Sequence, residues 1–209
     1  FGGAGLAHMN QYGTKLSTFA KIRAKASRHA ANNPLALFKT VVTEEEVLNS
    51  PVMWPGVMTR LMACPPTCGG AAAILCSEAF TKKHGLDHSI RIRAQAMTTD
   101  YTSTFTGDHS DMRQLVGYDM THAAATRVYE EAGVSPKDIG VIELHDCFAH
   151  NELITYEGLG LCPEGGAEKF IEDGDNTYGG RYVTNPSGGL LSKGHPLGAT
   201  GLAQCTELV

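Results

Sequence analysis

The feature that most constrains the fold is a pair of junctions, at each of which a short apolar strand leads through a turn into a helix. The first junction follows the apolar run at residues 141–144, and the second lies within residues 182–209, where glycines punctuate the turn. Strands that alternate with helices in this way are typical of layered α/β proteins, which place their functional sites where strands end. The sequence therefore predicts an α/β fold with two candidate site segments.

The remaining elements fit the same fold class. Apolar spacing and capping residues predict helices at residues 4–12, 15–31, 77–85, 121–132 and 149–157. Thr43, with Glu46 three residues later, forms a capping-box pattern that predicts one more short helix. The small apolar run at residues 69–76 predicts a strand buried on both faces, and the strict alternation at residues 90–96 predicts a strand with one wet face.

Composition excludes several classes of protein. The 17 basic and 22 acidic side chains give a formal net charge of -5, and no basic stripe of the kind that binds nucleic acid is present. No apolar run approaches the roughly 20 residues that cross a bilayer, so we expect no membrane span. The six cysteines are thinly spread in a chain large enough to bury a core, which favours reduced thiols. We expect a soluble intracellular protein without nucleic-acid partners.

The first candidate site segment places a histidine and a cysteine two residues apart. If strand geometry persists, His145 and Cys147 point to the same side, where an imidazole and a thiol can exchange protons with one substrate near neutral pH. The alternative is a hydrogen-bonded core histidine beside a small buried thiol. A metal site formed by His145, Cys147 and His150 is a weaker alternative because a fourth ligand is missing.

The second candidate site segment is rich in glycine and opens a helix. Gly194 and Gly198 leave room for a ligand to approach the backbone, and Pro196 suits the first turn of the following helix. The free N–H groups at such a helix start favour a developing oxyanion, and His195 stands beside them. We therefore predict substrate binding by Gly194, Pro196 and Gly198. The alternative is tight helix packing next to a turn histidine.

Both segments resemble motifs of the thiolases. The stretch NPSGGLLSKGHPLGATG at residues 185–201 is similar to their glycine-histidine-proline motif. The stretch HDCF at residues 145–148 resembles the variant found in the sterol carrier protein 2 thiolases, and residues 162–165 and 174–180 are also similar to that subfamily. We therefore identify the chain as a member of the thiolase superfamily.

The resemblance implies a fold and a division of the chain. The thiolase fold has two similar βαβαβαββ halves in an α-β-α-β-α arrangement of layers. Residues 1–85 would be the end of the N-terminal half with its helical loop region, and residues 86–209 would be most of the C-terminal half. The nucleophilic cysteine would then precede Phe1, and a second oxyanion loop would follow Val209. We expect the isolated chain to be inactive.

The resemblance also implies roles for three residues. His195 would activate the nucleophilic cysteine and help form an oxyanion hole, and His145 would replace the asparagine that holds an oxyanion-hole water in other thiolases. Cys147 would be the acid/base at the reacting carbon. The implied function is that of an acyl-CoA C-acyltransferase, which makes or breaks a carbon-carbon bond through an acyl-cysteine.

The same resemblance implies the partners of the protein. Coenzyme A and acyl-CoA would be substrates, with no permanently bound cofactor and no metal. Family members are usually homodimers or homotetramers. The compartment would be the cytoplasm in a bacterium or the peroxisomal matrix in a eukaryote.

Two other functions fit the same motifs. One is a retro-aldol lyase of the thiolase fold that acts on sterol side-chain CoA thioesters without an acyl-enzyme. Cys147 favours the thiolase over this lyase, because aldol cleavage has no need of a thiol acid paired with a second cysteine. The other is a non-catalytic lipid-binding or scaffold protein, which the presence of His145, Cys147 and His195 disfavours.

Overall fold

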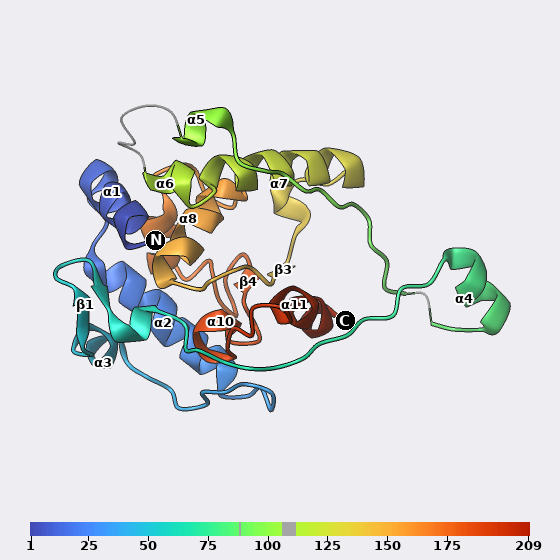
Figure 1. Ribbon diagram of the computed structural model, residues 1–209, viewed down its shortest axis with the longest axis horizontal. Helices are drawn as coiled ribbons and strands as arrows, with labels where there is room; N and C mark the ends of the chain where they lie inside the picture. Colours follow the sequence, from blue (N-terminus) through green and yellow to red (C-terminus); the bar gives the residue numbers. More distant parts are fainter. Residues whose placement is uncertain (88, 106–111) are drawn as a thin grey trace.

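The computed structural model describes residues 1–87, 89–105 and 112–209, so the predicted part 86–209 is described except for residues 88 and 106–111. Figure 1 shows how its elements are arranged. In chain order these are α1 (Gly2–Tyr12), α2 (Leu16–Ala30), α3 (Glu44–Leu48), β1 (Val52–Trp54), β2 (Met58–Thr59), η1 (Arg60–Met62), α4 (Glu78–His84), α5 (Thr102–Phe105), α6 (Met112–Leu115), α7 (Tyr118–Ala132), η2 (Pro136–Asp138), β3 (Val141–Ile142), α8 (Ala149–Gly158), α9 (Ala167–Glu172), β4 (Val183–Thr184), α10 (Gly189–Ser192) and α11 (Thr200–Leu208).

Helix α2 lies at the centre of the hydrophobic core. Its side chains Phe19 and Ile22 are fully buried, and the helix packs against α3, α8, α9 and α10. The core combines these residues with Leu153 and Leu191, so both predicted parts of the chain contribute to it. The domain boundary between residues 85 and 86 stays a prediction.

The predicted helix ends are confirmed where capping residues set them. Gly13, Gly85 and Gly133 adopt left-handed backbone angles directly after α1, α4 and α7, the conformation that ends a helix at little steric cost to glycine. Thr43 and Glu46 form the predicted capping box at the start of α3. These ends depend on local backbone geometry, which is why sequence alone could predict them.

The two junctions are joined by a parallel pair of strands. Strand β3 pairs with β4 in the register Val141 to Val183 and Ile142 to Thr184. The predicted strand at residues 141–144 is confirmed for its first two residues, and the short strand near Tyr182 is confirmed as β4. Because the strands are parallel, the segments that follow β3 and β4 leave the sheet at the same end. The antiparallel hairpin of β1 and β2 was not predicted from the sequence.

The other two predicted strands are wrong. Residues 69–76 and 90–96 form no strand, and their apolar side chains are largely exposed, with Ile74 91% and Ile92 69% accessible. Figure 1 shows this stretch extending away from the rest of the molecule, with α4 at its far end. Among the described residues no other strand is hydrogen-bonded beside either run. An apolar alternation forms a strand only where a partner can accept its backbone hydrogen bonds.

No helix within residues 1–87, 89–105 and 112–209 is both long enough and apolar enough to span a bilayer.

Candidate active site

The two predicted imidazoles lie next to each other. The ring centroids of His145 and His195 are 4.8 Å apart, and the rings are nearly perpendicular at 89°. Burial, followed by the neighbouring His195, lowers the pKa of His145, and burial also lowers the pKa of His195. Both imidazoles are therefore neutral near pH 7, and each can donate one hydrogen bond and accept another.

Cys147, two residues after His145, is buried. Only 5% of the residue is exposed, and burial raises the pKa of the thiol to about 12, with smaller contributions from Cys64 and Asp146. A thiol with this pKa stays protonated at neutral pH. It therefore holds a proton that a strongly basic carbanion could take, and it is unsuited to act as a thiolate nucleophile.

A segment that the sequence analysis gave no role connects Cys147 to His195. This bridging segment, residues 63–67, begins with Cys64 N–H donating to the carbonyl oxygen of Cys147 at 2.9 Å. At its other end Pro66 pairs with His195, and the backbone N–H of His195 donates to Thr67 Oγ1 at 2.6 Å. The same short segment thus holds the backbones of both residues. Its consecutive prolines at 65 and 66 are visible in the sequence but do not indicate these contacts.

Asp146 joins the first junction to the second. Its carboxylate is fully buried and accepts hydrogen bonds from the backbone N–H groups of Leu190 at 2.7 Å and Leu191 at 3.4 Å. Burial raises the pKa of Asp146 to about 8, and Glu152 adds to the rise. Gly189 has a φ of 60°, and a Cβ there would collide with this carboxylate. Glycine is therefore required at this position for the close approach.

Glu143 and Asn185 make further links across the same edge. The Glu143 carboxylate accepts from the backbone N–H and the hydroxyl of Ser187, both at 2.9 Å. The side-chain oxygen of Asn185 accepts from the N–H of Leu144 at 2.8 Å. Asn185 has a φ of 50°, a left-handed conformation that asparagine tolerates better than most residues. Together with Asp146, these contacts fix the position of one junction relative to the other.

Helix α2 supports the site with buried cations that the sequence analysis did not identify as functional. Lys25, 2% exposed, pairs with Glu152 of α8 and donates to Thr184 Oγ1 at 2.8 Å. Arg23 donates to Ser192 Oγ at 2.5 Å, and burial lowers its pKa to about 10. These contacts join residues more than a hundred positions apart, so no local pattern could have predicted them.

The predicted substrate-binding residues differ in their surroundings. Gly194 has a φ of 117°, and a Cβ there would lie 2.9 Å from the Thr67 methyl carbon, so contact with the bridging segment requires glycine. Pro196 lies in the turn before α11, so its predicted place in the first helical turn is wrong, because that helix begins at Thr200. A Cβ at Gly198 would point into open space. Substrate binding by these residues stays a prediction.

His150, the third ligand of the alternative metal site, points elsewhere. It is fully buried, its Nε2 lies 2.9 Å from the carbonyl oxygen of Val57, and its ring packs against Phe19 at 4.1 Å. In the part of the chain that the structure describes, no group of three or more His, Cys, Asp or Glu side chains is arranged to hold a metal ion.

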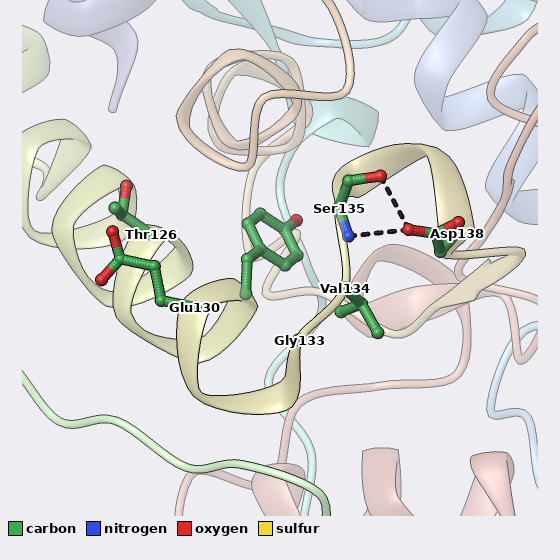
Figure 2. A pocket seen from close by; sticks show the side chains of 7 residues that line it. Thr126, Glu130, Gly133, Val134, Ser135 and Asp138 are labelled. Carbon is green, nitrogen blue, oxygen red and sulfur yellow. Dashed lines mark hydrogen bonds between the residues drawn. The ribbon is translucent and has the colours of Figure 1, made fainter.

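Two hollows of the surface are lined by residues other than the site histidines. Figure 2 shows a pocket of about 550 Å³ beside the end of α7, in which Ser135 N–H and hydroxyl both contact Asp138. A second pocket of about 460 Å³ follows the same helix and is lined mainly by apolar side chains such as Met120 and Leu159. Neither is lined by His145, Cys147 or His195. The candidate site therefore rests on the chemistry and arrangement of its side chains.

Comparison with known proteins establishes the family. Residues 102–209 match the family described as "Thiolase C-terminal domain-like". The chain belongs to the thiolase family. The sterol carrier protein 2 of Bos taurus is 56% identical to this thiolase chain over 209 residues, which is all of the chain and 38% of that protein. These matches confirm the predicted resemblance to the sterol carrier protein 2 type.

Two more distant relatives show how widely the thiolase fold is shared. The benzoylsuccinyl-CoA thiolase subunit BbsB of Thauera aromatica is 41% identical over 202 residues, covering 97% of this chain and 51% of that protein. A solved structure, "Ltp2-ChsH2(DUF35) aldolase", superposes with a TM-score of 0.78 at 25% identity, over 99% of this chain and 53% of that one. The predicted thiolase fold is confirmed. This chain spans 38% of the length of the first sterol carrier proteins that it matches.

Proposed function

We propose that this chain carries the proton-transfer part of a 3-oxoacyl-CoA thiolase, an acyl-CoA C-acyltransferase. The observation that supports it most strongly is the 4.8 Å approach of the His145 and His195 rings, with Cys147 held to His195 through the bridging segment. Two neutral imidazoles and one protonated thiol supply the hydrogen-bond donors and the acid that carbon-carbon cleavage next to a thioester needs.

In the proposed reaction a cysteine supplied from elsewhere in the full-length protein attacks the 3-oxo carbon of the substrate, after His195 takes its proton. His145 and His195 donate hydrogen bonds to the oxygens on which negative charge develops. The bond between C2 and C3 then breaks, its electron pair stays on C2, and Cys147 gives its proton to that carbon. The thiol of coenzyme A next gives its proton to the Cys147 thiolate and attacks the acyl-cysteine. The bond between the acyl carbon and the cysteine sulfur breaks, and the cysteine leaves as a thiolate that regains its proton from His195, so every group returns to its starting state.

Coenzyme A and its acyl thioesters would therefore be substrates, and no permanently bound cofactor is needed. The name of the Thauera relative, a CoA thiolase subunit, is consistent with this substrate class. We also propose a homodimer or homotetramer, as the family resemblance implies.

The test is thiolysis of acetoacetyl-CoA by the full-length protein, followed through the formation of acetyl-CoA. We expect Cys147→Ala to lower kcat about 10²- to 10⁴-fold, the usual contribution of a general acid or base. Cys76→Ser is the matched control, because Cys76 is exposed in the extended stretch and should leave the rate unchanged. Undiminished thiolysis by Cys147→Ala would remove the proposed role. Binding of acyl-CoA by the wild-type protein without any turnover would favour the non-catalytic lipid-binding alternative.

A retro-aldol lyase is the second candidate, and the solved aldolase that superposes at a TM-score of 0.78 favours it. This reaction would split a 3-hydroxyacyl-CoA into a carbonyl compound and a shorter acyl-CoA without consuming free coenzyme A. The two candidates are separated by incubating the full-length protein with 3-hydroxyacyl-CoA and 3-oxoacyl-CoA substrates. Cleavage that needs free coenzyme A supports the thiolase, and cleavage of the hydroxy substrate without it supports the lyase.

A further inference from the structure

The imidazole of His195 has a buried partner on the following helix. Its Nδ1 lies 2.7 Å from the hydroxyl oxygen of Thr200, the first residue of α11, and Thr200 is only 4% exposed. Within the part of the chain that the structure describes, no hydrogen bond is made by the other ring nitrogen, Nε2. The two nitrogens of His195 are therefore in different environments.

A second contact of Thr200 decides which atom carries the proton. The hydroxyl oxygen lies 3.1 Å from the carbonyl oxygen of Pro196, to which it donates. A carbonyl oxygen can only accept, so this short oxygen-oxygen contact is favourable only when the single hydroxyl proton lies between the two atoms. That proton is then not available to His195. The hydrogen in the contact between the ring and the hydroxyl must come from Nδ1.

We propose that Thr200 is a positioning residue that holds His195 as the Nδ1–H tautomer and so leaves the Nε2 lone pair free to accept a proton from a thiol. A neutral imidazole carries one ring proton, so fixing it on Nδ1 leaves Nε2 as the base. The catalytic consequence rests on the function proposed above, in which His195 activates the nucleophilic cysteine. The tautomer itself does not depend on that function.

The same contact holds the ring in place. The backbone N–H of His195 is held by Thr67, and Nδ1 of its ring is held by the Thr200 hydroxyl. His145 then meets the ring at 89°. The bases of thiol-activating sites are commonly oriented by a third group in this way.

The experiment uses the full-length protein labelled with ¹⁵N at histidine, with the His195 signals identified by their loss in His195→Gln. We expect the wild type to show a protonated Nδ1 and an unprotonated Nε2 at this residue at pH 7.5. In Thr200→Val the pattern should shift toward the Nε2–H form, and kcat/KM for thiolysis should fall about tenfold, as expected for one lost hydrogen bond. Thr200→Ser keeps the hydroxyl and should restore both properties.

Thr206→Val is the matched control. Thr206 lies on the same helix, and its hydroxyl donates to the carbonyl oxygen four residues earlier, as that of Thr200 does. Unlike Thr200 it is exposed, and among the described residues its hydroxyl makes no hydrogen bond with a histidine. It should change neither the ¹⁵N pattern nor the rate. An Nε2–H tautomer in the wild type, or an unchanged Nδ1–H tautomer in Thr200→Val, would overturn the inference. If the tautomers behave as expected but the wild type catalyses no thiolysis, the proposed function fails and the role of Thr200 in setting the tautomer stands.

Discussion

The strand-to-helix junctions and the extended stretch at residues 68–101 carry comparable apolar patterns but differ in burial. At the second junction Leu190 and Leu191 are fully buried, whereas Ile74 and Ile92 of the extended stretch are 91% and 69% exposed. The junctions are tied together by the carboxyl groups of Glu143 and Asp146. In the described residues of the stretch, few side chains reach the core.

The comparison teaches that an apolar pattern specifies which face of an element can be buried, but not whether a partner is present to bury it. Strand β3 has only two residues, yet it is kept because it pairs with β4 and its Ile142 carbonyl oxygen accepts from the backbone N–H of Asn185 at 2.7 Å. Residues 90–96 have the stronger alternation and form no strand. Substitutions at four positions of the full-length protein, two of them with matched controls, test this difference.

The largest effect is expected at Leu191. Its side chain is fully buried in the core, so Leu191→Ala should lower the free energy of unfolding by about 2–5 kcal/mol through lost burial and a residual cavity. Leu197→Ala, at a position 83% exposed in the same segment, is the matched control and should change little. Denaturant unfolding measures both. Equal costs at the two positions would show that the junction is not packed as described.

Asp146 should add a pH dependence to the stability of the junctions. Because its pKa is raised to about 8 in the folded protein from an ordinary 3.8, the folded state keeps a proton that the unfolded chain loses. The free energy of unfolding should therefore fall as pH rises from about 4 to about 8, and Asp146→Asn should make that fall shallower. Asp146→Ala should cost about 1–3 kcal/mol at pH 5, since it leaves the amides of Leu190 and Leu191 unpaired. A variant with an unchanged pH slope would contradict the raised pKa.

Thr67 tests the link between the bridging segment and His195. Thr67→Val removes the hydroxyl that accepts from the His195 backbone, which should cost about 1 kcal/mol. Thr126→Val removes a hydroxyl on the exposed face of α7 and should cost less. Amide hydrogen exchange at His195 should accelerate in the first variant alone. Unchanged protection there would mean that Thr67 does not hold this backbone.

The smallest effect is expected at Ile92. Because this side chain is 69% exposed, Ile92→Ala should change the free energy of unfolding by less than about 0.5 kcal/mol. A cost close to that of Leu191→Ala would show that the extended stretch is buried in solution. The junctions and residues 68–101 would then not differ in burial.

The sequence predicted those parts of the fold that depend on the conformational preferences of neighbouring residues. Gly13 and Gly133 end helices because their backbone angles suit glycine, and the glycine-histidine-proline segment was identified from its own residues. Both site segments were predicted at strand-to-helix junctions, and the structure places His145 beside His195 where two parallel strands end. The bridging segment and the Lys25 contacts could not be predicted, because they depend on residues far apart in sequence. The catalytic roles of His145, Cys147 and His195 stay predictions.

The bridging segment has a consequence for how this protein can vary. Cys64 is hydrogen-bonded to Cys147, and Thr67 is hydrogen-bonded to His195. The number of peptide units between Cys64 and Thr67 therefore determines the distance between the backbones of Cys147 and His195. An inserted or deleted residue between positions 64 and 67 would break one contact or displace the other. Side chains there can be exchanged more readily than the length can change.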